Sequence, residues 1–445
     1  MQQKPIRVLM LDPTARRYWL RTLHAGQAGT DSREDTTLLG GETLCQFLLR
    51  ENSDALILAR GPLPFLAGNK LTVGYLSPLT GIPHYSFVGG RAAAELLNLG
   101  LDAICFNGST FASIAGAYLV ISGCAPNLTV EWKSAAELPS GQRSAYYALL
   151  AAELAGQPER GSILTLGQGA RLGYRTANLA VEGLYHAGRG GAGHVLSRFA
   201  AALVLRGIPL TLEQALGPRA EAFRELRERE LRPLMDLYGE RLSCRDGGTV
   251  TKLHATGSGK RPTLPARNAQ RLGYAFADLG ASKMLLASRT GQTGCHWCQV
   301  NCRHWHWVDV DYAPGGRDRF LDDFEPTYAI FAMLDLRPDE DTLKGRLRLL
   351  EEVDRRLIVP LEQLGCDIID MGVGLAALFE GLEAGIIPSE DLPAGLRGLP
   401  AYLGNLEAAE RAVIALSADE PAPALRALGD GPQALAKRYL ALRDR

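Results

Sequence analysis

Three cysteines within eight positions constrain this chain more than any other feature. They lie at the spacing C-x2-C-x3-C, as Cys295, Cys298 and Cys302. Thiolates this close cannot all pair as disulfides, and their charges repel one another unless a cation neutralises them. A role as small buried hydrophobes fits poorly beside polar neighbours such as His296 and Arg303. The spacing therefore predicts a bound metal ion or metal cluster.

The spacing leaves two kinds of metal site open. Ligation by thiolates alone at short spacing is typical of an iron–sulfur cluster, and a four-iron cluster needs a fourth ligand from elsewhere in the chain. A zinc ion would require a closed tetrahedral site, to which His304 or His306 can contribute the fourth ligand. The cluster is the favoured interpretation, and zinc is the alternative.

Composition excludes several other classes of protein. With 445 residues, the chain is long enough for two or three domains with substantial cores. Its net charge of -1 provides no basic field to attract nucleic acid. No segment approaches ~20 uninterrupted apolar residues, so no membrane span is expected. The N-terminal residues lack the apolar core of a signal peptide, and the clustered cysteines suit a reducing environment, so the expected location is the cytoplasm.

Hydrophobic patterning predicts an α+β fold with two regions. In the first, short apolar segments alternate with glycine-rich turns, and strands are predicted at 6–12, 55–59, 71–75 and 103–106. Beyond Pro209, helical spacing dominates, as in residues 218–237. We therefore expect a β-rich, sandwich-like N-terminal domain over residues 1–205. A largely α-helical region, residues 206–445, follows it and carries the cysteine motif.

A glycine-rich segment, Gly188-Arg189-Gly190-Gly191-Ala192-Gly193, opens a predicted helix. Backbone N–H groups in such a loop can approach an anionic ligand. The glycines are not in the GxGxxG register, so a dinucleotide is not expected. As a motif on its own, the segment is interpreted equally well as a plain tight turn.

Taken in order along the chain, several stretches resemble the aldehyde ferredoxin oxidoreductase family of tungsten–pterin enzymes. Leu39-Gly40-Gly41, the turn at residues 77–81 and the glycine-rich segment at 188–193 resemble its first domain. The cysteine motif resembles its cluster motif, and Glu362-x-x-Gly365-Cys366-Asp367 is similar to its first pterin signature, D-x-x-G-L-D. Shorter similarities are Leu-Pro-Ala-Arg-Asn at 264–268 and Phe324-Glu325, where the family has a Tyr-Glu pair.

The resemblance implies a fold, cofactors and an activity. The family places a pterin-binding sheet domain before two helical domains. Two pterins hold tungsten, and a nearby four-iron cluster passes electrons to ferredoxin. The implied cofactors are thus a [4Fe–4S] cluster and a tungstopterin or molybdopterin. The implied activity is oxidation or reduction of an aldehyde or related substrate, with ferredoxin or another redox protein as the electron-transfer partner.

The resemblance also implies roles for individual residues. Cys295, Cys298 and Cys302 correspond to cluster ligands, and Glu325 to a catalytic group that faces the metal and transfers protons. The residues implied to bind the pterins are Lys70, Arg189, Gly190, Gly191 and Asp367.

Departures from the family pattern are equally informative. The family's fourth cluster cysteine belongs to a second signature, D-x-x-G-L-C, which is absent here together with the part that holds the catalytic histidine. We therefore expect a shortened, divergent member, with a second subunit as a candidate source of the missing part. Lys70 replaces an arginine and loses its planar fork. Phe87 replaces an asparagine that helps bind a metal between the pterin phosphates, so pterin binding stays open.

Cys366 is the candidate fourth ligand within this chain. It stands where the first signature has an apolar leucine, so the alternative is a buried cysteine that fills a leucine-sized space. Three interpretations of function remain. The first is an oxidoreductase with an iron–sulfur cluster, and the second is a non-catalytic electron-transfer or assembly subunit that retains the fold. The third is a structural zinc protein.

Overall fold

The structure is a computed structural model. It describes residues 5–24, 40–63, 70–107, 116–241, 263, 265–273, 291–298, 303–322, 328–400 and 402–443. The chain divides into two compact units. The first comprises Met1–Arg171, Asn178–Asp236 and Gly294–Gln299, and the second comprises Leu172–Ala177, Leu237–Thr293 and Val300–Arg445. Each unit is described by itself below.

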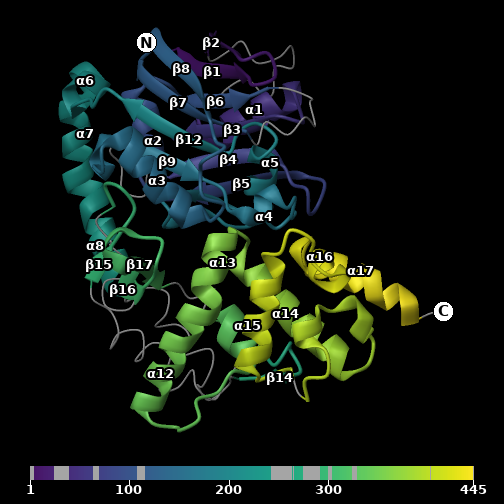
Figure 1. Cartoon of the computed structure of the whole chain (residues 1–445). Coiled ribbons are helices and arrows are strands. Elements are labelled where there is room, and N and C mark those ends of the chain that lie inside the picture. Colours follow the sequence, from purple (N-terminus) through teal and green to yellow (C-terminus); the bar gives the residue numbers. More distant parts are fainter. Residues whose placement is uncertain are drawn as a thin grey trace. The chain divides into compact units, whose positions relative to one another are not determined.

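Two six-stranded sheets dominate the first unit (Figure 1). One has the order β2-β1-β6-β3-β4-β5, in which only β1 and β6 are parallel. Its strands are β1 (Ile6–Asp12), β2 (Arg17–Leu23), β3 (Leu56–Arg60), β4 (Leu71–Leu76), β5 (Pro83–Val88) and β6 (Ala103–Phe106). The helix α1 (Gly41–Glu51) packs Leu44 and Leu48 against Ile57 of this sheet, so apolar side chains at helical spacing meet one face of alternating strand residues.

The other sheet has the order β11-β10-β9-β12-β7-β8, in which only β7 and β12 are parallel. Its strands are β7 (Ala117–Cys124), β8 (Asn127–Ser134), β9 (Ser162–Thr165), β10 (Leu179–Val181), β11 (Tyr185–Ala187) and β12 (Ala202–Gly207). The helix α3 (Gln142–Leu154) covers one face, where Leu149 packs with Val120, Ile163 and Val204.

A fully buried helix, α2 (Ala92–Asn98), connects the two sheets. It contacts β3 of one sheet and β9 and β12 of the other. The ring of Phe106 in β6 also stacks on Phe199, with centroids 5.5 Å apart. Short helices complete the described part of this unit: η1 (Pro158–Arg160), α4 (Gln168–Arg171), α5 (Ala192–Leu196), α6 (Leu212–Leu216), η2 (Gly217–Arg219), α7 (Ala220–Leu226) and η3 (Arg227–Leu231). The next helix, α8 (Arg232–Arg241), begins in the first unit and ends in the second.

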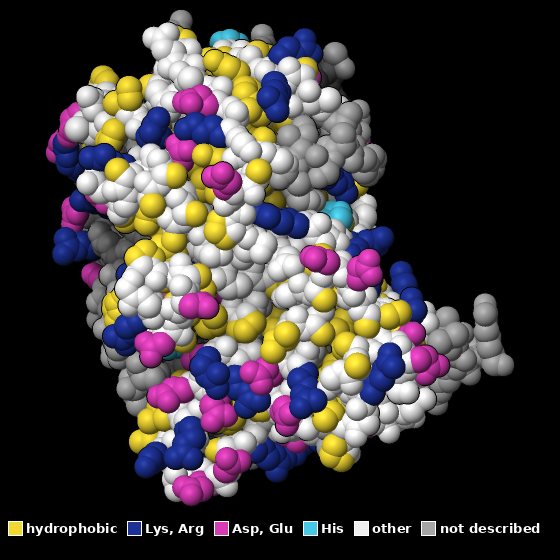
Figure 2. All heavy atoms as spheres, in the orientation of Figure 1, with side chains coloured by type: hydrophobic (Ala, Val, Ile, Leu, Met, Phe, Trp, Pro, Cys, Tyr) yellow, Lys and Arg dark blue, Asp and Glu magenta, His cyan; other side chains and the backbone are white. Residues whose placement is uncertain are grey.

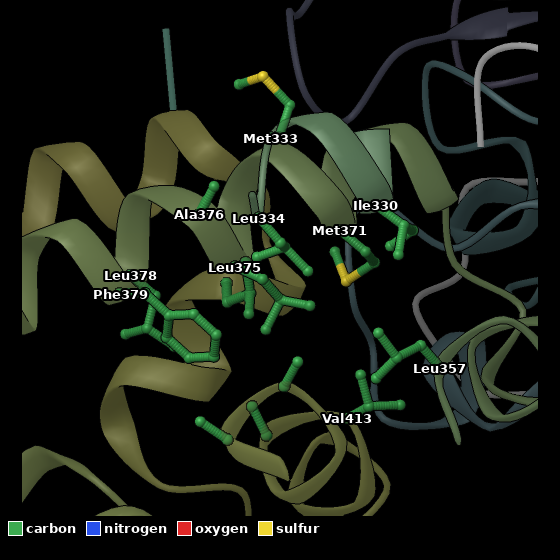
Figure 3. Packing of buried hydrophobic residues seen from close by; sticks show 14 of the residues in the cluster. Ile330, Met333, Leu334, Leu357, Met371, Leu375, Ala376, Leu378, Phe379 and Val413 are labelled. Carbon is green, nitrogen blue, oxygen red and sulfur yellow. The ribbon is translucent and has the colours of Figure 1, made fainter. Parts of the chain in front are cut away.

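Helices form the core of the second unit (Figure 3). They are η7 (Tyr328–Ala332), α12 (Leu343–Val353), η8 (Asp354–Ile358), α13 (Val359–Leu364), α14 (Ile368–Glu383), η9 (Ser389–Asp391), η10 (Ala394–Leu396), α15 (Leu406–Leu416), α16 (Pro423–Gly429) and α17 (Pro432–Arg443). Met371, Leu375 and Phe379 of α14 are fully buried in this core, together with Leu357 and Val413 of neighbouring helices. Spacings of four residues on α14 place these three side chains along one face.

The second unit also contains short sheets. Its three-stranded antiparallel sheet comprises β15 (Gly291–Thr293), β16 (Arg303–Asp309) and β17 (Arg317–Asp322), with η6 (Pro314–Gly316) before β17. A two-stranded sheet pairs β13 (Pro265–Ala266) with β14 (Arg271–Leu272). The predicted α+β class is confirmed, and the region expected to be largely helical also contains these strands.

The surface carries charges of both signs in mixture. Figure 2 shows basic and acidic side chains interspersed over the visible face, in keeping with a net charge of -1. No helix in the described ranges combines the length and apolar character needed to cross a membrane.

Candidate functional site

The first two cysteines of the motif lie in a tight turn of the first unit. The backbone N–H of Cys298 donates to the carbonyl oxygen of Cys295 at 2.9 Å, and Trp297 between them has a φ of 63°. A turn closed from residue i to i+3 brings the two ends within about 7 Å. Both thiols are half-buried. The third predicted ligand, Cys302, lies outside the described residues.

The Cys295 side chain packs next to Gly89, which follows β5. A Cβ atom at Gly89 would lie 2.8 Å from the Sγ of Cys295 and 2.7 Å from Cδ1 of Tyr185. The hydroxyl of Tyr185, in β11, donates to the carbonyl oxygen of Gly294 at 2.8 Å. Tyr185 thus fixes the start of the cysteine turn, and the missing side chain at Gly89 provides the space for the thiol.

Next to Gly89 and Tyr185, a partly buried network of charged side chains leads to the start of α2. The backbone N–H of Arg91 and the hydroxyl of Ser162 donate to Oε1 of Glu182, at 2.9 and 2.8 Å. The Arg91 guanidinium donates to the carbonyl oxygen of Glu159 at 3.0 Å and approaches Glu95 at 3.5 Å. Its Nε is buried without a hydrogen-bond partner among the described residues. One N–H donor of this partly exposed side chain is therefore not used by the parts of the protein that the structure describes.

Burial perturbs the ionisable groups around the cysteine turn. It raises the pKa of Glu182 to about 7, so this carboxyl group changes its charge near neutral pH. Burial, with a further contribution from the charge of Arg91, lowers the pKa of His296 to about 4. His296 is consequently neutral at pH 7, and Arg91 is the positive group that acts on the turn.

These features fit a thiolate-ligated cluster. Within the described ranges, no group of three or more His, Cys, Asp and Glu side chains is placed to hold a metal ion. The two described thiols nevertheless lie at the ends of one turn, over a glycine that leaves room for them.

Hydroxyl groups of β4, β5 and the turn between them hold the backbone of the glycine-rich segment at residues 188–191. Tyr75 and Ser86 donate to the carbonyl oxygen of Arg189, at 2.9 and 3.1 Å, and Ser77 donates to that of Gly190 at 2.9 Å. Both glycines at 190 and 191 have positive φ, near 87°. These carbonyl groups point towards β4, β5 and the turn between them, while the Arg189 side chain is exposed.

Two other positions implied by the resemblance lie on the same sheet. Lys70 is exposed immediately before β4. Phe87 in β5 is 52% exposed, although phenylalanine is usually buried. The ring presents an apolar surface where a polar metal-binding side chain would be needed.

In the second unit, Asp367 caps a helix. The α13 helix ends at Gly365, whose φ is 68°, and Asp367 is the N-cap of α14. Its Oδ1 accepts from the backbone N–H groups of Ile369 and Asp370, at 3.0 and 3.3 Å. The backbone N–H of Asp367 donates to the carbonyl oxygen of Thr176 at 2.9 Å. Asp367 therefore caps α14, and its Oδ1 is already used in these hydrogen bonds.

Cys366 lies in the apolar core of the second unit. Its side chain is fully buried, its backbone bridges to Ala177, and its thiol contacts Thr176. Burial raises the pKa of the Cys366 thiol to about 12. A metal ligand must be a thiolate, so this environment favours the leucine-like packing role. Ligation by Cys366 stays a prediction.

Sequence reasoning missed the support of the cysteine turn. Gly89, Arg91, Glu182 and Tyr185 come from two segments that are distant in sequence both from each other and from the cysteines, and no motif in the sequence marks these four residues as neighbours of the cysteine turn. Glu325, the predicted catalytic residue, lies outside the described residues.

A separate cavity of about 680 Å³ lies in the second unit. Its lining mixes Arg337, Arg348 and Arg356 with the acidic residues Asp339 and Glu352. None of the predicted site residues lines it, so it is distinct from the features above.

Comparison with known proteins gives two family matches. The family model described as "Aldehyde ferredoxin oxidoreductase, N-terminal domain" matches residues 31–205. The model for "Aldehyde ferredoxin oxidoreductase, domains 2 & 3" matches residues 243–443.

Similar curated proteins include the tungsten-containing aldehyde ferredoxin oxidoreductases of Pyrococcus horikoshii and Pyrococcus abyssi. Each is 27% identical to this chain over 361 residues, covering 79% of this chain and 53% of the relative. The chain thus spans about half the length of these relatives. A similar solved structure is the active site complex BamBC of benzoyl coenzyme A reductase with 1,5-dienoyl-CoA. It has a TM-score of 0.70 at 20% identity, covering 97% of this chain and 63% of the other, and this likeness shows the fold.

Proposed function

The chain belongs to the aldehyde ferredoxin oxidoreductase family, and from this premise we propose that it is an oxidoreductase chain built around an iron–sulfur cluster. The observation that carries the proposal is the Cys295–Cys298 turn, seated on Gly89 and held by Tyr185. Cys302 follows in the motif as the third ligand. A [4Fe–4S] cluster supplies one-electron transfer when it is bound.

The residues around the turn provide a positive charge that suits a negatively charged group. Arg91 brings a positive charge and a buried N–H donor, and Glu95, Glu182 and the Glu159 carbonyl fix its position. His296 is neutral at pH 7, so the favourable electrostatic interaction comes from Arg91.

The glycine-rich segment is the proposed site for pterin phosphates. Hydrogen bonds from the hydroxyls of Tyr75 and Ser77 hold the carbonyl groups of Arg189 and Gly190. The guanidinium of Arg189 is exposed and is suited to binding a phosphate. Lys70 contributes a second positive charge, and Asp367 accepts hydrogen bonds from a pterin ring. A tungstopterin, or a molybdopterin in its place, supplies the substrate-oxidising metal when bound, and Glu325 is the proposed proton-transfer group.

Two partners complete the proposal. One is a second subunit, which the named complex of the similar solved structure supports. Ferredoxin or another redox protein exchanges electrons with the cluster, and an aldehyde or related compound is the substrate class. The free cysteines among the described residues suit the reducing cytoplasm.

A second candidate is a non-catalytic electron-transfer or assembly subunit. The exposed Phe87, where the family has a metal-binding asparagine, favours it, because phenylalanine offers no oxygen or nitrogen ligand. This candidate keeps the cysteine turn and its cluster but not the pterin chemistry.

The two candidates separate on metal content and activity. The full chain, purified without oxygen, is analysed for iron, sulfide, tungsten, molybdenum and zinc, and assayed for aldehyde-dependent viologen reduction with and without a co-expressed partner. About four irons per chain with tungsten or molybdenum and activity support the oxidoreductase. Four irons without pterin metal or activity support the second candidate. Colourless protein with one zinc per chain contradicts both.

A further inference from the structure

Two consecutive glycines separate the cysteine turn from a carboxyl group. A Cβ atom at Gly89 would lie 2.8 Å from the Sγ of Cys295, and one at Gly90 would lie 2.9 Å from Oε2 of Glu182. Neighbouring Cα atoms are about 3.8 Å apart, so the Cys295 sulfur and the Glu182 oxygen are separated by at most about 13 Å. All four residues belong to the first unit. The structure thus places one titratable acid close to the cysteine turn.

The ring of Tyr185 contacts both glycines. Its Cδ1 atom is 2.7 Å from the Cβ position of Gly89, and its Cδ2 atom is 3.2 Å from that of Gly90. One edge of the ring therefore faces the glycine beside the cysteine, and the other edge faces the glycine beside the carboxyl group. A ring packed at this place lowers the local dielectric constant, so a charge on one side acts more strongly on the other side than it would in water.

Glu182 is hydrogen-bonded through one oxygen only. The backbone N–H of Arg91 and the hydroxyl of Ser162 both donate to Oε1, at 2.9 and 2.8 Å. Among the residues that the structure describes, no group donates a hydrogen bond to Oε2. Glu182 is partly exposed, so solvent can deliver a proton to that oxygen.

Charged neighbours of opposite sign act on Glu182. They are Arg91, immediately before α2, and Glu95 within α2. From α3, Arg143 donates to the carbonyl oxygen of the residue after Glu182, at 2.5 Å. His296 of the cysteine turn is neutral at pH 7. Burial outweighs the charge of Arg91 and raises the pKa of Glu182 to about 7, so a modest change in local charge changes its protonation near neutral pH.

We propose that Glu182 takes up a proton when an electron enters the cluster at the cysteine turn, and releases the proton when the electron leaves. The proposal rests on the proposed cluster. A low-potential one-electron donor, such as reduced ferredoxin, supplies the electron that reduces the iron. Solvent supplies the proton, which forms an O–H bond on Glu182. One positive charge thus accompanies one negative charge, and oxidation returns both.

Coulomb's law gives the size of the expected effect. An electron added about 13 Å away, at an effective dielectric constant of about 20, strengthens proton binding by Glu182 roughly tenfold. By linkage, the bound proton strengthens electron binding by the same factor. The midpoint potential should therefore fall as the pH rises from about 7 to about 8. The total fall should be about 59 mV, which is tenfold for one electron.

Redox titrations of the full chain, purified without oxygen, test the proposal. The midpoint potential is measured from the electron paramagnetic resonance signal of the reduced cluster, between about pH 5 and pH 10. The wild type should show the fall, and Glu182→Gln should not, because an amide takes up no proton in this range. Ser162→Ala removes a hydrogen bond to the ionised carboxylate, so it should move the fall to higher pH.

Glu153→Gln is the matched control. Glu153 is also a partly buried acid of the first unit. Although burial opposes it, hydrogen bonds from Tyr118 and Lys133 lower the pKa of Glu153. This group therefore stays ionised over the range of the fall, and the variant should show the same pH dependence as the wild type.

Several outcomes overturn the proposal. These are a wild-type potential that is constant with pH, an equal fall in Glu182→Gln, a fall at unchanged pH in Ser162→Ala, and loss of the fall in Glu153→Gln. If Glu182→Gln does not retain the cluster, the direction of the shift in Ser162→Ala decides the proposal. Iron and sulfide are measured on the same samples. A wild type without a cluster overturns the proposed function as well, whereas a cluster with a constant potential overturns only the role of Glu182.

Discussion

The two regions predicted to supply cluster ligands have opposite construction. Around Cys295, a glycine without a side chain and a positive φ in the turn leave a half-buried thiol, and the charge of Arg91 acts on the adjacent His296. Around Cys366, apolar side chains close over a thiol that has no exposed surface. The difference favours Cys295 over Cys366 as a ligand, because a metal binds the thiolate and burial opposes ionisation of the Cys366 thiol.

The first way to break this comparison is to fill the space beneath the cysteine turn. Gly89→Ala places a Cβ atom 2.8 Å from the Sγ of Cys295 and should abolish most iron binding. Overpacking of this kind also lowers the free energy of unfolding by about 1–3 kcal/mol. Iron per chain is measured after anaerobic purification. Gly116→Ala is the control, since no atom lies within 4 Å of its Cβ position; equal iron in both variants would contradict the role of Gly89.

The second prediction concerns Glu182, a partly buried acid that accepts a hydrogen bond from the backbone of Arg91. Burial raises the pKa of Glu182 from its ordinary 4.5 to about 7 in the folded protein. The unfolded chain therefore loses this proton at lower pH than the folded chain does. As a result, the free energy of unfolding should fall as the pH rises from about 4.5 to 7, by on the order of 2–3 kcal/mol.

Glu182→Gln should remove this pH dependence. Urea unfolding at several pH values compares the variant with the wild type. The stability difference should grow in favour of the variant between pH 4.5 and 7 and stay constant above. Parallel stability curves across that range would show that Glu182 is ionised in the folded state like an exposed acid.

The third prediction separates the two roles of Asp367. Asp367→Ala removes an N-cap and should lower the free energy of unfolding by about 1 kcal/mol, whereas Asp367→Asn retains a capping oxygen and should cost less. If Asp367 also binds a pterin, both variants should lose pterin, measured by fluorescence of the released and oxidised cofactor. Equal stability of the two variants would argue against the capping role.

The smallest effect is expected at Cys366. Cys366→Ala leaves a small cavity in the helical core and should cost about 1 kcal/mol of stability without changing iron content. Iron loss in this variant, with the stability cost unchanged, would establish Cys366 as the fourth ligand and remove the contrast between the two regions.

Local sequence patterns predicted much of the fold. The strands predicted at 6–12 and 103–106 coincide with β1 and β6. Both arise from neighbouring residues, through β-branched and apolar side chains. The α+β class and the family are confirmed, while the proposed boundary at residue 205 stays a prediction.

The support of the site could not be predicted from local patterns. Gly89, Tyr185 and Cys295 meet although nearly a hundred or more residues separate each from the next. The strand β16 was also missed, because its alternating histidine and tryptophan residues were interpreted only as neighbours of a metal site. Its period of two becomes informative once the exposed and buried faces are distinguished.

The most direct test of the central claim is the iron and acid-labile sulfide content of two anaerobically purified chains, the wild type and Cys298→Ala. The account predicts about four irons and four sulfides per chain in the wild type, and almost none in the variant. One zinc per wild-type chain without sulfide, or an iron content unchanged by Cys298→Ala, would contradict the claim that the cysteine turn holds an iron–sulfur cluster.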